Sequence, residues 1–287
     1  MRKKLKLVII PLVLILLLAG VPALSLLTFS GNDYFLLKDE NGNINKISGK
    51  EYIYGVINAE LPASFEDEAV KAVAVAAYTL AVRRQSAQGF ITTDSNTFQA
   101  YKKPNKSTDK FSKIKRCVSE VYGEILVHGN KPILAAYHSL SSGKTENCGD
   151  IWTEDLPYLR SVDSGFDKDI DGFNQTLEIT LTDFIKLLEI PETENIEIKS
   201  RTEAGTVTEL SVGGSTFPGR QIRELLSLKS ANFDIAKDEN MLQITTRGFG
   251  HGVGLSQYGA NSLAMSGKNY REILGWYYTG VEIVKRN

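Results

Sequence analysis

Cysteine and histidine are scarce in this sequence, and their scarcity excludes several kinds of fold and site. The 287 residues include two cysteines, Cys117 and Cys148, and three histidines. Two cysteines cannot build the disulfide framework of a small secreted domain; they either form one bond in an oxidising compartment or remain separate buried thiols. The histidines lie far apart and no C-x-x-C pair occurs, so the spacing of metal ligands is missing. We predict neither a metal site nor a cofactor.

One segment does fit a metal-binding pattern. Residues 167–178 match D-x-D-x-D-G-x5-E, the spacing of a calcium loop. The segment leads into strand-like sequence rather than into a helix, and Asn174 stands at a position that is usually apolar. We therefore favour a solvated acidic turn over a calcium site at Asp167 to Glu178.

The sequence also lacks an excess of positive charge beyond its first residues. Of the 33 lysines and arginines, four precede residue 7, which leaves 29 against 34 acidic residues in the rest of the chain. A domain of net negative charge is not expected to bind nucleic acid or an anionic membrane surface as its main ligand. The chain contains no internal repeat and no low-complexity tail.

The only long apolar run is at the N-terminus. Residues 1–6 form a basic head, and residues 7–29 follow as 23 residues without a charge. This length spans a bilayer, and basic residues before the span place the N-terminus in the cytoplasm. We predict a single-pass transmembrane anchor in the cell membrane, with residues 30–287 as an exported domain outside the cytoplasm. The alternative is a signal peptide cleaved near residues 21–23.

The pattern of apolar residues predicts an α+β fold. Residues 65–84 are predicted to form a helix that is apolar on nearly every side between residues 70 and 77, as expected of a buried central helix. Helices and strands do not alternate regularly, which argues against an all-parallel sheet. We expect an Ala/Val-rich central helix with short mixed or antiparallel strands, and a possible smaller lobe at about residues 177–240.

The remaining elements are predicted from the same periodicities. A hairpin is expected around Asn41 and Gly42, and residues 138–152 form a polar loop of a length that is often functional. Thr182 is predicted to cap a helix. The predicted strands are residues 34–37, 44–47, 124–127, 133–137, 177–181, 196–199, 206–212 and 242–245. The other predicted helices are residues 50–59, 111–120, 182–188, 218–226 and 270–277.

The densest local signal is a glycine-rich segment, residues 247–260 (RGFGHGVGLSQYGA). It places five glycines around His251, Gln257 and Tyr258. Glycine permits positive φ and a close approach of backbone to a ligand, and the three side chains supply hydrogen-bond donors and acceptors. The segment therefore indicates binding of a polar, uncharged ligand. The alternative for His251 is that it only braces the loop.

A single carboxylate stands out in residues 55–62 (GVINAELP). Glu60 lies between Ala59 and Leu61 at the junction of two predicted helices, where Pro62 fixes the backbone. A carboxyl in apolar surroundings can keep its proton and then donate it, and rigid support is what a catalytic acid needs. A glutamate near a helix end is more often solvated or a cap, so this pattern alone is weak.

Five blocks of the sequence resemble the stage II sporulation protein D family. They are residues 51–79, 137–146, 150–152, 223–233 and 247–260. The matches run in order from about residue 34 to the end of the chain, and the last block is highly specific. The N-terminal apolar run also fits the family.

The resemblance implies a lytic transglycosylase of peptidoglycan. The family acts on glycan strands already stripped of stem peptides, during engulfment in sporulation, together with a sporulation cell-wall amidase and a membrane partner. Its catalytic domain would lie in the intermembrane space between mother cell and forespore, and its catalytic glutamate corresponds to Glu60. Two family features are missing. The loop at residues 91–101 lacks the His and Cys that bind zinc in some members, and Tyr78 replaces a usual arginine.

The chemistry implied by the resemblance agrees with the residues. Cleavage by the sugar's own 6-hydroxyl, which leaves 1,6-anhydroMurNAc ends, needs one carboxyl, whereas ordinary glycosidases use two. Asp94 and Glu146 are candidates for a second carboxylate. A muramidase-type hydrolase using the same Glu60 therefore stays open, as does a glycan-binding activator subunit of an amidase.

The candidate substrate-binding residues are polar side chains from three segments, residues 91–101, 138–152 and 247–260. Each has the alternative of bonding only the loop backbone. They are Gln99, Tyr101, His138, Ser139, Thr145, Glu146, His251, Gln257 and Tyr258.

Overall fold

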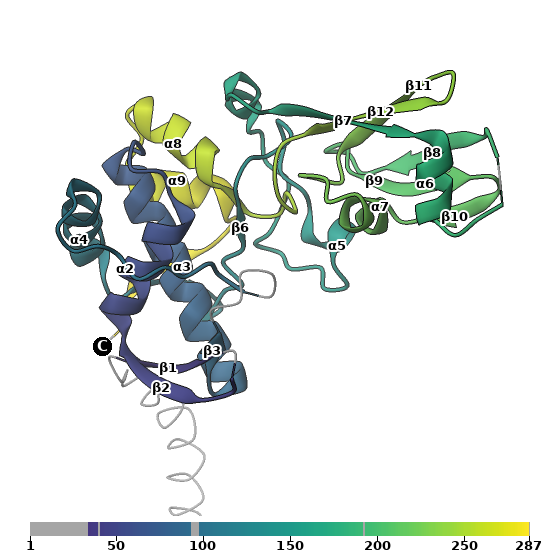
Figure 1. Cartoon of the computed structure of the whole chain (residues 1–287). Helices are drawn as coiled ribbons and strands as arrows, with labels where there is room; N and C mark the ends of the chain where they lie inside the picture. Colours follow the sequence, from purple (N-terminus) through teal and green to yellow (C-terminus); the bar gives the residue numbers. More distant parts are fainter. Residues whose placement is uncertain (1–33, 40, 93–97, 192, 287) are drawn as a thin grey trace, which may run out of the picture.

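The computed structural model describes residues 34–39, 41–92, 98–191 and 193–286. Within them lie eight α-helices, one 3-10 helix and five small sheets of two or three strands. Figure 1 shows a helix-rich lobe, which holds α2, α3, α4, α8 and α9, beside a sheet-rich lobe, which holds β7 to β12 with α6 and α7. Each lobe has its own cluster of buried apolar side chains.

The helix-rich lobe is built around one buried helix, α3 (Asp67–Gln88). Its residues 72–79 are buried without interruption. Because most of these side chains are alanine or valine, neighbouring helices can approach closely on several sides. Gly89 ends the helix in the left-handed conformation, at φ 79°. The helices that contact α3 are α2 (Gly49–Glu60), α4 (Asp109–Val121), α8 (Gln257–Met265) and α9 (Tyr270–Tyr277).

Short strands complete this lobe in three small sheets. β1 (Tyr34–Lys38) pairs antiparallel with β2 (Ile44–Ser48) and parallel with β3 (Ile91–Thr92). A second sheet joins β4 (Glu124–His128) to β5 (Lys131–Pro132) and β14 (Glu282–Lys285). The third is the parallel pair of β6 (Tyr137–His138) with β13 (Leu255–Ser256). The loop after β6 leads to the short helix α5 (Cys148–Ile151).

The sheet-rich lobe contains two antiparallel sheets, ordered β10-β9-β8 and β11-β12-β7. Phe184 and Phe233 are completely buried in its core. The 3-10 helix η1 (Gly165–Asp169) leads into it from the helix-rich lobe. Its elements are β7 (Asn174–Thr180), α6 (Leu181–Leu187), β8 (Ile196–Arg201), β9 (Val207–Val212), β10 (Ser215–Phe217), α7 (Gly219–Leu225), β11 (Phe233–Asp238) and β12 (Met241–Arg247).

The expected fold class and localisation need correction. The predicted span at residues 7–29 lies outside the described residues, and none of the described helices is both long and apolar enough to cross a membrane. The longest of the described helices, α3, is apolar in its middle but charged at both ends, and other helices pack against it. An α+β domain behind a transmembrane helix is therefore the wrong description, and the described chain is a mixed α/β protein. The predicted single-pass membrane localisation is wrong for the same reason, that none of the described helices could cross a membrane.

Several smaller expectations also differ from the structure. The predicted strand at residues 133–137 does not form, because β5 ends at Pro132 and Tyr137 pairs with β13 instead. Thr180, not Thr182, caps α6 by accepting the N–H of Asp183 at 3.0 Å. Helix α8 was not predicted. Cys117 and Cys148 are two separate buried thiols.

Candidate active site

Glu60 is the last residue of α2, and its carboxyl is held by two other segments of the chain. Oε1 accepts the backbone N–H of Ala100 at 2.8 Å, and Oε2 accepts Nε2–H of Gln257 at 3.0 Å. The chain leaves the helix at Leu61 in extended conformation, so Glu60 lies at the junction that the sequence predicts. The side chain remains partly exposed, and a ligand can therefore reach it.

Tyr137 and Gln99 form a second layer behind this carboxyl. The Tyr137 hydroxyl donates to Oε1 of Gln99 at 2.8 Å and lies 3.5 Å from Oε1 of Glu60. Gln99 is 1% exposed and donates its Nε2–H to the Tyr52 hydroxyl at 3.1 Å. Burial, and then the nearby Glu60 charge, raises the pKa of Tyr137 well above its ordinary value. Tyr137 therefore keeps its proton and acts as a hydrogen-bond donor.

The loop that carries Gln99 is fastened to α2 by Tyr101. The Tyr101 ring stacks on Tyr52, with centroids 5.8 Å apart and planes 7° apart. It covers Gly55 so closely that a Cβ at that position would lie 2.2 Å from the ring. The backbone N–H of Lys102 also donates to the Gly55 carbonyl at 3.1 Å. The glycine of the GVINAELP segment is thus required for packing, and Tyr101 acts on the site through the position of its loop.

The glycine-rich segment delivers Gln257 to Glu60. Its glycines 248, 250, 252 and 254 all have positive φ, and at Gly254 a Cβ would lie 2.1 Å from the carbonyl oxygen of Ala136. Such an approach between two backbones is possible only for glycine. The pairing of β13 with β6 follows directly, and the Ser256 side chain then caps α8 by accepting the N–H of Gly259 at 3.1 Å. Gln257 is the first residue of that helix.

A buried aspartate, Asp167, supports the start of α8 through hydrogen bonds. Oδ2 of Asp167 accepts hydrogen bonds from the Ser141 N–H at 3.0 Å, the Ser164 hydroxyl at 3.1 Å and the Ser256 hydroxyl at 2.7 Å. Burial raises the pKa of Asp167, while hydrogen bonds from Ser141 and Ser256 oppose that rise. The aspartate therefore ties the polar loop after β6 to the start of α8.

The position of Asp167 also overturns the calcium pattern. Its side chain points into the core, whereas Asp169, Asp171 and Glu178 are exposed. No group of three His, Cys, Asp or Glu side chains in the described ranges is placed to hold a metal ion. The residues of the calcium pattern therefore do not converge.

His138 and His251 form a separate cluster on the other side of β6. Successive strand residues point to opposite faces, so His138 points away from the Glu60 side that Tyr137 occupies. The His251 ring lies 5.5 Å from that of His138 and 5.1 Å from that of Trp152. Nδ1 of His138 lies 3.2 Å from the Val253 carbonyl oxygen, to which it donates, and its buried Nε2 has no partner among the described residues.

Both histidines of this cluster are neutral. Burial, with the neighbouring His251 as a smaller cause, lowers the pKa of His138 to about 3. Burial, and then the charge of Arg223, lowers the pKa of His251 to about 4. The Val253 backbone takes one ring nitrogen of each, because Nδ1 of His138 donates to its carbonyl and Nδ1 of His251 accepts its N–H at 3.1 Å. In the neutral imidazoles Nε2 is then an acceptor on His138 and a donor on His251.

The remaining predicted residues do not contact Glu60. Thr145 is completely buried, and its hydroxyl accepts the Val162 N–H at 2.8 Å, as the backbone alternative predicts. The Tyr258 N–H donates to the Ser139 carbonyl at 3.1 Å, and the Tyr258 ring packs on Phe65. These residues shape the loops around the site.

Glu146 is buried at the boundary between the two lobes. It is 2% exposed, and its Oε1 accepts the Thr202 hydroxyl at 3.0 Å. Burial raises the pKa of Glu146, against hydrogen bonds from Thr206 and Thr202 that lower it. Asp94, the other candidate for a second carboxylate, lies outside the described residues.

The sequence predicts Gln257, which bonds Glu60, and Gln99, which bonds Tyr137, but it does not single out Tyr137 itself. The signal was present, because Tyr137 begins the block that also contains His138 and Ser139. Its strand is only two residues long, and its contacts to Gln99 and Glu60 span 38 and 77 positions. No local pattern reports contacts of that range.

Comparison with known proteins shows which family the chain is similar to. Residues 38–128 match the family model SpoIID, described as stage II sporulation protein. Stage II sporulation protein D of Bacillus subtilis (strain 168) is 38% identical over 261 residues, which cover 85% of this chain and 76% of the relative. Its counterpart in Bacillus amyloliquefaciens is 36% identical over 264 residues, covering 86% and 77%.

The chain belongs to the stage II sporulation protein D family. This membership confirms the resemblance found in the sequence blocks. The match to the family model contains Glu60, Gln99 and Ala100, while Tyr137 and Gln257 lie beyond it. A more distant relative, the "Amidase enhancer" of Bacillus subtilis (strain 168), is 26% identical over 289 residues, covering 80% of this chain and 40% of the relative.

Proposed function

We propose that this family member is a lytic transglycosylase that cleaves peptide-free peptidoglycan strands during sporulation engulfment, with Glu60 as its single catalytic carboxyl. The observation that carries the proposal is the set of partners around Glu60. Its carboxyl receives hydrogen bonds from the Ala100 N–H and the Gln257 amide, and the Tyr137 hydroxyl lies 3.5 Å from its Oε1; none of these three residues is a second carboxylate. A retaining glycosidase would place its second carboxyl at about 5 Å.

One carboxyl is sufficient for the proposed reaction. Protonated Glu60 donates its proton to the oxygen that leaves C1 of MurNAc as that glycosidic bond breaks. The ionised carboxylate then takes the proton of the 6-hydroxyl, whose oxygen forms the new bond to C1 and closes the 1,6-anhydro ring. The proton given and the proton received balance, so Glu60 returns to its first state.

The groups around Glu60 prepare it for both steps. The Ala100 N–H and the Gln257 amide each hold one oxygen, so the carboxyl cannot rotate freely. The Gln99–Tyr52 hydrogen bond behind Tyr137 fixes the Tyr137 hydroxyl on the same side. We assign Gln99, Tyr137 and Gln257 as positioning residues, and His138, His251 and Trp152 as neutral groups beside a more distant sugar.

The relatives support the proposed setting. One is named for enhancing an amidase, which supports a cell-wall amidase as the partner that removes stem peptides before cleavage. We propose residues 30–287 as the catalytic domain, with a smaller lobe at about residues 177–240; the separate apolar cluster of the sheet-rich lobe supports that division.

A second candidate function is favoured by the same relative. In it, the chain only binds glycan and activates the amidase, and Glu60 serves as a hydrogen-bonding residue. Mass spectrometry of products from purified peptide-free glycan tests the two. Anhydro ends support the transglycosylase, new reducing ends indicate a muramidase-type hydrolase, and uncleaved strands together with a faster amidase support the activator.

A further inference from the structure

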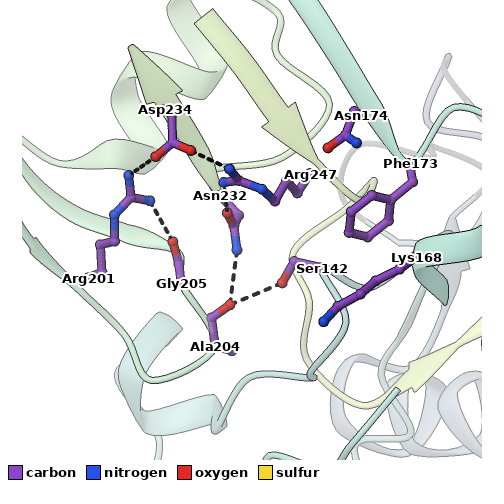
Figure 2. Close-up of a pocket in the computed structure, with 10 residues that line it drawn as sticks. All are labelled: Ser142, Lys168, Phe173, Asn174, Arg201, Ala204, Gly205, Asn232, Asp234 and Arg247. Carbon is purple, nitrogen blue, oxygen red and sulfur yellow. Dashed lines mark hydrogen bonds and ion pairs between the residues drawn. The ribbon is translucent and has the colours of Figure 1, made fainter. Parts of the chain in front are cut away.

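A pocket separate from the Glu60 site lies between the two lobes, and Figure 2 shows the residues around it. Its volume is about 450 Å³. We name it the lobe pocket. Four segments of the sheet-rich lobe meet there with the loop after β6 and with η1. Its lining residues are Ser142, Lys168, Phe173, Asn174, Arg201, Ala204, Gly205, Asn232, Asp234 and Arg247.

The lobe pocket has an excess of positive charge. Three lining residues are cationic, Lys168, Arg201 and Arg247, and one is anionic, Asp234. Both arginines form ion pairs with Asp234, whereas Lys168 makes no ion pair within the described part of the chain. Two positive charges therefore remain uncompensated, in a protein whose chain beyond residue 6 is net negative.

The guanidinium of Arg201 is fixed in place before any ligand arrives, and that of Arg247 is held by its ion pair with Asp234. Arg201 donates to the Gly205 and Phe233 carbonyls at 2.9 and 2.8 Å, in addition to its pair with Asp234. Asn232 donates to the Ala204 carbonyl at 2.9 Å and so holds the adjoining loop. Little side-chain freedom is left to lose on binding, and planar guanidinium groups match the shape of a carboxylate.

The same glycine-rich segment connects the lobe pocket to Glu60. Arg247 begins that segment in the pocket, and Gln257 near its end contacts Glu60. Ten residues span at most about 35 Å even when fully extended. Ser142 and Lys168 each adjoin a residue of the Asp167 hydrogen-bond set, which also reaches Ser256. A glycan several sugars long can therefore reach both sites.

We propose that the lobe pocket binds the carboxylate of the lactyl group on a MurNAc residue of the glycan strand. This inference rests on the proposed function. While a stem peptide is attached, the lactyl carbonyl belongs to an uncharged amide. Hydrolysis of that amide by an amidase leaves a carboxylate, which the cationic pocket attracts. The pocket thus binds strands from which the peptide has been removed in preference to strands that keep it, because only the former carry a free lactyl carboxylate.

The test measures binding rather than cleavage. The full-length chain carrying Glu60→Gln, which leaves the strands intact, is titrated calorimetrically with peptide-free glycan strands. A second titration uses the same strands after carbodiimide coupling of their lactyl carboxylates to methylamine, and a third uses strands that keep their stem peptides. Neutralising the carboxylate should weaken binding about tenfold or more, because hydrogen bonds to a charged acceptor are the strong ones.

Variants of Lys168, the exposed lysine of the lobe pocket, test whether the loss of affinity arises in that pocket. In the same background, Lys168→Gln should weaken binding of the free-carboxylate strands about twofold to fivefold, as for one exposed ion pair, and should not change binding of the amidated strands. Lys168→Arg should restore the affinity. Lys186→Gln, which removes an exposed lysine from α6 outside the pocket, serves as the matched control and should bind like the parent.

Three results would overturn the proposal. One is equal affinity for free-carboxylate and amidated strands. Another is a loss of affinity from Lys168→Gln that is equally large for the two kinds of strand. The third is tighter binding of strands with stem peptides, which would assign the pocket to the carboxylates of the peptide. Because no arm needs cleavage, failure of the transglycosylase proposal appears separately, as uncleaved strands with the wild-type protein.

Discussion

Nε2 of Gln257 lies 3.0 Å from Oε2 of Glu60, although the two residues are 197 positions apart. The bond joins the first residue of α8 to the last residue of α2. Since the Ala100 N–H holds the other oxygen at 2.8 Å, the plane of the carboxyl is fixed by two independent segments. The glycine-rich segment therefore acts on Glu60 through Gln257.

Gln257→Leu should lower kcat on peptide-free glycan about tenfold to a hundredfold and leave KM nearly unchanged. Leucine fills the space but cannot hold the Glu60 carboxyl, and small misplacements of catalytic groups have effects of this size. Steady-state rates of release of anhydro-ended fragments measure the change. Gln243→Leu, which removes an exposed glutamine from β12, is the matched control. A kcat for Gln257→Leu equal to that of the control would show that Gln257 does not position the carboxyl.

Gly254→Ala should destabilise the protein by about 3 kcal/mol or more, because the new Cβ combines a strained backbone with a clash. Gly254 has φ 74°, and the Cβ would lie 2.1 Å from the Ala136 carbonyl oxygen. Gly267→Ala is the control, since Gly267 has φ 91° and open space around the added atom. It should cost only about 1–2 kcal/mol. Urea unfolding of both variants measures the difference, and equal losses would mean that backbone strain alone explains the glycine at 254.

The elements that were predictable from the sequence are those with strong local patterns. Helix α3 was predictable from residues 70–77, nearly all of which are alanine or valine; it begins two residues after the predicted start and ends four residues after the predicted end. The β1–β2 hairpin was found from Asn41 and Gly42. The predicted helix at residues 270–277 coincides with α9, whose Asn269 and Glu272 form a capping box.

The elements that were missed depend on contacts between distant segments. Helix α8 follows directly on a run of glycines, which predicts a loop, and it forms because Ser256 caps it and α3 packs against it. Tyr137 was missed because its role depends on Gln99 and Glu60. The predicted substrate-binding residues divide into two groups, since successive residues of β6 place Tyr137 and His138 on opposite sides of the strand. A strand of two residues carries no periodicity from which this can be read.

Lowering the pH should destabilise the protein through His138 and His251. In the folded chain the pKa of His138 is about 3 and that of His251 about 4, whereas an unfolded histidine titrates near about 6.5. Between these values the unfolded state binds more protons, so stability is present above about pH 6.5 and falls as the pH drops. One such group contributes a slope of at most about 1.4 kcal/mol per pH unit.

Replacement of His138 tests that assignment. His138→Gln keeps a donor for the Val253 carbonyl but cannot titrate, so its unfolding free energy should fall less steeply than that of the wild type between pH 6 and pH 5. Urea unfolding at each pH, in the same buffers, measures the slope of unfolding free energy against pH for the variant and the wild type. The two proteins share all other titratable groups. Parallel slopes would mean that His138 is protonated without loss of stability.

Glu60→Gln should abolish cleavage while fold and glycan binding remain. Glutamine preserves the shape of the side chain and accepts the Ala100 N–H, but it can neither give nor take a proton. Loss of general acid/base catalysis lowers the rate about 100- to 10,000-fold, and more where one group serves both steps. Release of 1,6-anhydro-ended fragments from peptide-free glycan is measured at equal concentrations of variant and wild type. Glu66→Gln, an exposed neighbour at the same helix junction, is the matched control.

The outcome separates catalysis from a structural role for Glu60. If Glu60 were only a solvated residue or a helix end, Glu60→Gln would lower the free energy of unfolding by about 0.5 kcal/mol or less and would leave the cleavage rate unchanged. Wild-type release by Glu60→Gln would thus remove the proposed mechanism and direct the search to Asp94 and Glu146. Circular dichroism of the variant must show the native spectrum, because inactivity from unfolding has a different cause. With the fold intact and glycan still bound, loss of anhydro products in Glu60→Gln but not in Glu66→Gln places the proton transfer on this one carboxyl.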